Sequence, residues 1–164
     1  MIIILSPAKI LNFKEQTTID KFSTPEFMTK TESLVKLMRD LSPYDLSKLL
    51  DINTSLTQLN FDRFFNWHKP FTPKNAKQAA LTFDGEVFRG LNAKTFSAED
   101  FEYAQAHLRI LSGLYGILRP MDLIQAYRLE VSSKLQNPFG KDLYEFWKES
   151  VTESTLKALK KSGK

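Results

Sequence analysis

Two glycines bracketed by two arginines give this chain its clearest potential for binding chemistry, in the segment His107–Pro120. Gly113 and Gly116 permit a sharp turn and a close approach to another molecule, because glycine has no Cβ. Arg109 and Arg119 flank the turn, where they could neutralise a phosphate. A helix that runs into this turn would present backbone N–H groups to the anion as well. The alternative, which the local pattern alone favours, is that Gly113 only caps the preceding helix.

A second candidate site is an anion cleft that would combine Ser6, Lys9, Arg128 and Glu130. Ser6 and Lys9 belong to a Ser-Pro-Ala-Lys sequence directly after a predicted strand, at the strand end where many α/β proteins bind ligands. Arg128 and Glu130 would share one face of another predicted strand. In an enzyme, Lys9 would be the electrostatic stabiliser and Glu130 the general acid or base. The alternatives are a solvated lysine and an ordinary surface ion pair.

No metal site and no cofactor are predicted. The chain contains no cysteine, which excludes disulfides, thiol catalysis and cysteine-based zinc or iron–sulfur sites. His68 and His107 lie in different segments, and no paired carboxylates accompany them. Direct coordination of a metal ion would therefore have to rely mostly on carboxylates. The Ser6–Lys9 segment also lacks the glycine-rich cradle of a Walker motif.

Length and composition indicate one globular domain. The chain has 164 residues, of which 42% are hydrophobic, enough for a sizeable core. Its net charge of +4 is compatible with a nucleic-acid partner without requiring one. Between Arg63 and Lys77 basic residues alternate with aromatic ones, either as a stacking surface for nucleic acid or as core aromatics with a solvated rim. The apolar N-terminus is too short to span a membrane, so we expect a soluble cytoplasmic protein.

The periodicity predicts an α+β (mixed α/β) fold, with several short helices around a small sheet. Hydroxyl–proline pairs that begin at Thr24, Ser42 and Thr72 predict three helix starts. A further helix is expected over Thr54–Trp67, from its apolar spacing.

The second half of the chain has a more mixed pattern. Residues 80–88 resemble a strand, a turn and a second strand, and a capping box predicts a long helix over Ser97–Gly113. A final helix is expected from Leu143. We predict that Ile2–Leu5, as a buried strand, and Tyr127–Val131 belong to the same sheet, which would bring the two halves of the anion cleft together.

Several segments resemble the bacterial peroxide-stress protein YaaA family in order and spacing over essentially all 164 residues: Ile4–Lys9, Phe71–Pro73, Leu108-Arg109 with Leu111–Pro120, Tyr127–Glu130, and Gly140–Tyr144 with Phe146-Trp147. The resemblance implies an oxidative-stress protein that helps keep free iron low and so limits Fenton damage to DNA. It also implies DNA binding, a positively charged cleft and a helix-hairpin-helix element. Members of the family are longer than this chain, so we expect residues 1–164 to form a single domain that lacks the C-terminal part of the family domain.

The helix-hairpin-helix element would fall on the Ser97–Gly113 helix, the glycine turn and the chain after it. The expected DNA contacts are then Arg109, Gly113, Leu114, Tyr115, Gly116 and Arg119. Two residues separate the glycines here, whereas the usual hairpin has one between them. Pro120 also disfavours a helical conformation in the residue before it.

Two functional hypotheses follow. The first is a non-enzymatic protein that binds double-stranded or structured DNA without reading its sequence and affects iron indirectly. The second is an enzyme that acts on an anionic small molecule or nucleic acid in the predicted anion cleft. We favour the first, and convergence of Lys9, Arg128 and Glu130 in one cleft would favour the second. A scaffold with neither activity is a third alternative, and the sequence leaves the oligomeric state open.

Overall fold

The computed structural model describes residues 1–15 and 17–163 of the chain. Strand β1 (Ile3–Leu5) comes first, followed by the helices α1 (Met28–Arg39), α2 (Pro43–Leu50) and α3 (Thr54–Asn66). The middle of the chain holds β2 (Lys77–Gln78), α4 (Ala79–Thr82), α5 (Glu86–Leu91) and the 3-10 helix η1 (Ala93–Thr95). The last part consists of α6 (Ala98–His107), β3 (Leu108–Ser112), β4 (Gly116–Leu118), β5 (Leu123–Ile124) and α7 (Leu143–Lys161).

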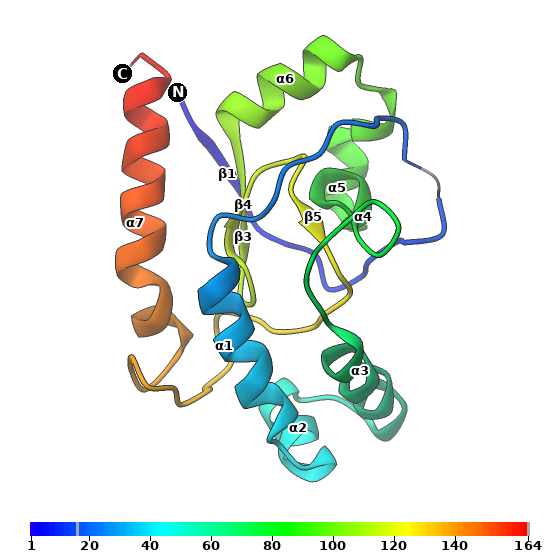
Figure 1. Cartoon of the computed structure of the whole chain (residues 1–164), viewed down its shortest axis with the longest axis vertical. Helices are drawn as coiled ribbons and strands as arrows, with labels where there is room; N and C mark the ends of the chain where they lie inside the picture. Colours follow the sequence, from blue (N-terminus) through cyan, green and yellow to red (C-terminus); the bar gives the residue numbers. More distant parts are fainter. Residues whose placement is uncertain (16, 164) are drawn as a thin grey trace.

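A three-stranded mixed sheet lies at the centre of the molecule, in the order β1-β3-β4. Strand β1 runs parallel to β3, with Leu5 opposite Ile110, and β4 returns antiparallel to β3. Strands β2 and β5 form a separate antiparallel pair. Helix α7 lies along one side of the central sheet, while α6 and the α1–α3 group lie toward opposite ends (Figure 1). The α+β class predicted from the sequence is confirmed.

Strand β1 is where the sequence predicted it, but the expectation that it is buried is wrong. Ile3 and Ile4 are exposed, at 43% and 47%. No strand of the described chain pairs with the outer edge of β1. A continuous apolar run has the same pattern in an edge strand as in a buried one, so the sequence alone could not separate the two cases.

Local capping chemistry sets several of the helix starts as predicted. The Ser42 hydroxyl accepts a hydrogen bond from the backbone N–H of Asp45 at 3.1 Å, and Pro43 is the first residue of α2. Ser97 and Asp100 form the predicted capping box at the start of α6. These interactions satisfy N–H groups that have no partner within the helix. Helices α3 and α7 also begin where their patterns indicated.

The long helix predicted over Ser97–Gly113 is wrong beyond His107. Helix α6 ends there, and residues 108–112 form β3, which pairs with β1 on one side and β4 on the other. Leu108, Ile110 and Ser112 are buried while the residues between them are partly exposed, so the period is that of a strand. The two glycines therefore connect two strands of a hairpin, and these residues do not form a helix-hairpin-helix element.

The strand–turn–strand predicted for residues 80–88 is also wrong, because both arms are helical. Asp84 and Gly85 separate α4 from α5, and Gly85 is the N-cap residue of α5 in an extended conformation. Glu86 follows in the first turn, where a carboxylate favours the helix N-terminus. The Asp-Gly pair is thus a helix start rather than a hairpin turn.

Two of the three hydroxyl–proline pairs do not start a helix. Helix α1 begins at Met28, because Ser23 just before the Thr24–Pro25 pair is held in a bridge with Asp122. Residues after Thr72 form a turn closed by the backbone N–H of Ala76, which donates to the Thr72 carbonyl at 2.9 Å. Tertiary pairing overrides the local signal at the first place, and at the second the chain forms a local turn that does not continue as a helix.

Candidate functional site

The anion cleft predicted from the sequence has a structural counterpart at the end of the parallel strand pair. Because β1 and β3 run parallel, the residues after Leu5 and those at the end of β3 meet at one edge of the sheet. A cavity of about 390 Å³ opens there, within the size range of small-molecule sites. We call it the Lys9 cleft. Its lining residues are Ser6, Pro7, Ala8, Lys9, Leu111, Tyr127, Arg128, Leu129, Glu130, Val131, Ser132 and Tyr144.

Residues 127–131 do not form the predicted strand, and so they do not share a sheet with β1. They run along the cleft without a strand partner in the described chain. Gly113 explains their position: an added Cβ at Gly113 would lie 2.1 Å from the carbonyl oxygen of Leu129 and 2.9 Å from the carbonyl carbon of Glu130. The absence of a side chain lets the hairpin backbone contact the Leu129–Glu130 backbone directly.

A buried hydroxyl pair fixes the start of the same segment. The hydroxyls of Tyr127 and Ser112 lie 2.8 Å apart, and the ring of Tyr127 packs edge-on against Tyr115. Burial raises the pKa of the Tyr127 hydroxyl well above its usual range, although the Ser112 hydrogen bond opposes the rise. The hydroxyl thus stays protonated and holds Tyr127 against the hairpin, one residue before Arg128.

Charged side chains from both segments meet in the Lys9 cleft. The Lys9 Nζ lies 3.0 Å from the Glu130 Oε1, with the side chains 64% and 40% exposed. An ion pair this exposed contributes at most about 1 kcal/mol to stability. Arg128 also lines the cleft, and its guanidinium forms no ion pair or hydrogen bond with the described residues. The arrangement offers two cations and a carboxylate beside apolar walls.

The glycine hairpin, in contrast, lies in the core. Leu114 and Tyr115 are fully buried. The carbonyl oxygens of Gly113 and Leu114 accept hydrogen bonds from the Trp147 indole and the Thr31 hydroxyl, at 2.8 and 2.9 Å. Of the backbone N–H groups expected to face a phosphate, that of Tyr115 donates internally, to the Ser112 hydroxyl at 3.0 Å.

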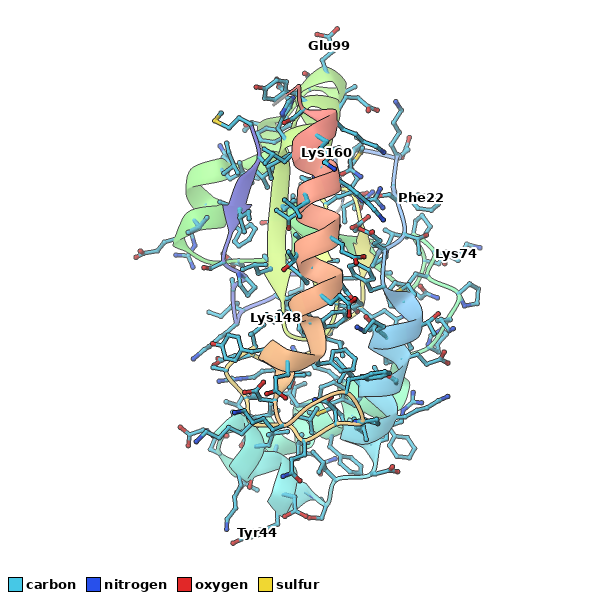
Figure 2. The ribbon with its side chains drawn as sticks, turned by 90° about the vertical axis from the view of Figure 1, so that its left-hand side faces the viewer. Phe22, Tyr44, Lys74, Glu99, Lys148 and Lys160 are labelled. Carbon is cyan, nitrogen blue, oxygen red and sulfur yellow. The ribbon has the colours of Figure 1, made fainter. Side chains whose placement is uncertain are left out.

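Gly116 has a structural reason for being glycine. Its φ is +77°, and an added Cβ would lie 2.7 Å from the Trp147 ring. Helix α7, which carries Trp147, therefore packs directly on the hairpin, and it lies in front of the sheet in Figure 2. The expected close approach of Gly113 and Gly116 exists, but the approaching groups belong to the same chain.

The two arginines that flank the hairpin are held by internal acceptors. The Nη2 of Arg119 lies 2.8 Å from the Oδ1 of Asp122, a carboxylate that is 1% exposed, and it also donates to the Thr24 carbonyl. Burial raises the pKa of Asp122, and the Arg119 guanidinium opposes that rise. Arg109 donates to the carbonyls of Gln105 and Leu108 at 2.9 and 2.7 Å. Both side chains support the fold.

A comparison with known protein families identifies the family of the chain. The family model described as "Peroxide stress protein YaaA" matches residues 1–163. The chain belongs to the peroxide stress protein YaaA family. In this YaaA-family chain, the match includes both the Lys9 cleft and the buried hairpin. The protein is accordingly a peroxide stress protein.

The basic and aromatic stretch between Arg63 and Lys77 is mostly core and rim in this member of the YaaA family. Phe64, Trp67 and Phe71 are buried. Lys77 is buried as well, and its Nζ donates to two backbone carbonyls at 2.9 Å, those of Asn12 and Glu15. Stacking on nucleic acid is therefore not open to most of these rings.

Within residues 1–15 and 17–163, no group of three or more His, Cys, Asp or Glu side chains lies close enough together to hold a metal ion. None of the helices described is both long enough and apolar enough to cross a membrane.

Sequence reasoning missed the residues that position the cleft of this YaaA-family protein. Ser112 and Tyr127 form the buried hydroxyl pair, and Gly113 provides the contact for Leu129. The glycine was recognised as a close-approach position, but nothing in the sequence indicated what approaches it. The apolar lining, including Leu111 and Tyr144, had no local signal at all.

Proposed function

We propose that this peroxide stress protein binds an anionic ligand in the Lys9 cleft. The observation that carries the proposal is the convergence of Lys9 with Arg128 and Glu130, which lie more than a hundred residues later in the sequence, at one cavity of about 390 Å³. Lys9 has two further ammonium donors besides the one directed at Glu130, and Arg128 has a full guanidinium fork. These are the donors that recognise phosphate and carboxylate groups.

The walls of the cleft suit a ligand with an apolar or ring-shaped part. Leu111, Leu129 and Val131 line it together with the rings of Tyr127 and Tyr144. Ligand sites commonly combine such walls with a few convergent polar groups that fix orientation. The expected ligand is therefore a small organic anion with its charged end on the cations.

Catalysis in the same cleft extends this proposal. Glu130, beside Lys9, would act as the general acid or base, a role that contributes about 10²–10⁴-fold to a rate. Glu130→Gln should then lower turnover of the bound ligand by about that factor without weakening its binding, since the amide keeps the side-chain shape and removes a negative charge beside Lys9. Unchanged turnover would leave binding as the function of the cleft.

Sequence-independent binding of DNA is a second candidate, in which the same cations contact backbone phosphates. The net charge of +4, together with a cation, Arg128, that has no carboxylate partner among the described residues, favours it. Affinity for a DNA duplex would fall with salt at a slope of about −0.9 per phosphate neutralised. The effect on free iron that the family resemblance implies would follow from the bound ligand.

The proposal is tested by calorimetric titration of the chain with phosphate, citrate, nucleoside monophosphates and a short DNA duplex. Lys9→Met and Arg128→Gln should each lower the affinity for the bound anion about tenfold or more. Lys74→Ala removes the charge of an exposed loop residue that does not line the cleft (labelled in Figure 2), and it should change affinity less than about twofold. Equal loss in all three variants would indicate diffuse charge attraction and would contradict a defined site.

A further inference from the structure

Tyr144 lines the Lys9 cleft from the first turn of α7. It is 61% exposed, and no other large hydrophobic residue of the described chain is both exposed and part of this lining. Each of the other four tyrosine rings packs against a second ring or an ammonium group: Tyr44 on Lys48, Tyr103 on His107, and Tyr115 and Tyr127 on each other. The Tyr144 ring has no such partner among the described residues.

The helix turn that carries Tyr144 is held firmly by its neighbours. Leu143, Phe146 and Trp147 are buried, and their spacing places them on one face of α7. The Asp142 carboxylate caps the helix by accepting a backbone N–H at 2.9 Å. Tyr144 lies outside the buried face, so its ring stays exposed on a turn that is fixed by packing and capping.

Gly113 joins this helix to the segment that carries the cations of the cleft. Its carbonyl oxygen accepts the hydrogen bond from the Trp147 indole at 2.8 Å. Its missing Cβ leaves room for the Leu129 carbonyl, one residue after Arg128. The helix of Tyr144 and the segment of Arg128 are therefore fastened to the same residue, which limits the ordering cost when a ligand binds.

An exposed aromatic ring beside cations suits a ligand that combines a planar ring with an anionic group. Every nucleobase has a π-face that can stack on a tyrosine ring. The apolar side chains of Leu111 and Val131 line the same cleft. Lys9 and Arg128 supply the donors that recognise phosphate. An aliphatic anion would use the cations and leave the Tyr144 ring without a partner.

We propose that the Lys9 cleft binds a nucleoside monophosphate, with its base stacked on the Tyr144 ring and its phosphate on Lys9 and Arg128. This inference rests on the proposed function, because the two cations are the same. Tyr144 adds the selection between anions. Inorganic phosphate and citrate have no base, and the bases of a DNA duplex are already stacked on one another.

The test compares adenosine monophosphate with ribose 5-phosphate by calorimetric titration at constant ionic strength. The two ligands share the sugar and the phosphate and differ in the base. Wild-type protein should bind adenosine monophosphate about tenfold more tightly or better, because base–aromatic stacking contributes a factor of that order. In Tyr144→Leu this advantage should disappear, while the affinity for ribose 5-phosphate stays within about twofold. Equal affinity of wild type for the two ligands would overturn the inference.

Two controls identify the ring as the cause. Tyr144→Phe keeps the ring and should bind adenosine monophosphate within about twofold of wild type; a loss as large as in Tyr144→Leu would contradict stacking. Tyr44→Leu removes a tyrosine that is 63% exposed and does not line the cleft (labelled in Figure 2), and it should change neither affinity. Retained binding of ribose 5-phosphate shows that Tyr144→Leu is folded, and the wild-type comparison of the two ligands needs no variant.

Failure of this inference and failure of the proposed function give different results. If Lys9→Met and Arg128→Gln lose anion binding while Tyr144→Leu binds adenosine monophosphate as wild type does, the cleft stands and the nucleotide assignment is wrong. If no variant changes the binding of any anion, both are wrong. A short single-stranded DNA separates a free nucleotide from a nucleic-acid strand. Tyr144→Leu should weaken the monophosphate at least as much as the strand, and a loss confined to the strand would overturn the monophosphate assignment.

Discussion

The glycine hairpin and the Lys9 cleft contain similar residues, but they differ in whether the polar groups of those residues have hydrogen-bond and ion-pair partners within the fold. In the hairpin, Arg119 neutralises a buried carboxylate and the backbone carbonyls of Gly113 and Leu114 accept internal hydrogen bonds. In the cleft, Lys9 takes part in an exposed ion pair and Arg128 has no partner in the described chain. Cations and glycines therefore indicate a binding site only where their donors remain unused by the fold.

The largest loss of stability is expected when the Arg119–Asp122 ion pair beside the hairpin is broken. Arg119→Ala would leave Asp122, which is 1% exposed, without its counter-charge. Removing one partner of a fully buried pair costs about 3–5 kcal/mol, and because the Arg119 side chain is 37% exposed this range is an upper bound here. Urea unfolding should therefore show a large loss in the free energy of unfolding. Arg89→Ala, which breaks an exposed pair with Asp84, should cost less than about 1 kcal/mol; similar costs for the two variants would mean that Arg119 is not structural.

A smaller but still clear loss in the free energy of unfolding is expected at the backbone contact between the hairpin and the cleft. In Gly113→Ala, the new Cβ would overlap the Leu129 carbonyl oxygen, and because both partners are backbone the segment must move. Overpacking of this kind costs about 1–3 kcal/mol, and it should also weaken anion binding by displacing Glu130. Gly90→Ala is the matched control, since no atom lies within 4 Å of its added Cβ. That helical substitution should be neutral or stabilising by up to about 1 kcal/mol.

A modest effect is expected from the hydroxyl pair that positions the cleft. Tyr127→Phe removes the hydrogen bond to Ser112, which keeps its bond from the Tyr115 N–H at 3.0 Å. The free energy of unfolding should fall by about 0.5–1.5 kcal/mol. Loss of ligand affinity along with that change would show that the buried hydroxyl positions Arg128. An unchanged affinity would limit the role of the hydroxyl to stability.

The smallest effect on stability is expected at the centre of the proposed site. Lys9→Met breaks an exposed ion pair and should change the free energy of unfolding by less than about 1 kcal/mol. The same variant should lose most of its anion binding. A large stability loss would place Lys9 with Arg119 among the structural cations, and the contrast between the two regions would fail.

Local chemistry explains which parts of the fold could be predicted from the sequence. The Ser42–Pro43 start and the Ser97–Asp100 capping box depend on neighbouring residues only, and both were correct. The run Leu108–Ser112 suits either a helix or a strand, and its pairing with β1, a hundred residues earlier in the chain, decides the outcome. Pairing at that distance has no signal in a single sequence.

The candidate site illustrates the same limit. Lys9 and Arg128 were predicted to lie close together through a shared sheet, but residues 127–131 are not a strand. They reach the cleft because Gly113 allows a backbone contact and Ser112 holds the Tyr127 hydroxyl. The chemistry of the side chains was visible in the sequence, whereas the internal partners that bury the hairpin arginines required the structure.

The most direct test of the account is an amide chemical-shift titration of the ¹⁵N-labelled chain with inorganic phosphate at constant ionic strength. We expect the shifts that saturate with phosphate to lie at residues 6–9 and 128–132, with the Arg128 side-chain signal moving at the same concentration. The amides of residues 113–116 and the side chains of Arg109 and Arg119 should stay unchanged. Saturable shifts at the hairpin and its arginines, with none in the Lys9 cleft, would contradict the account.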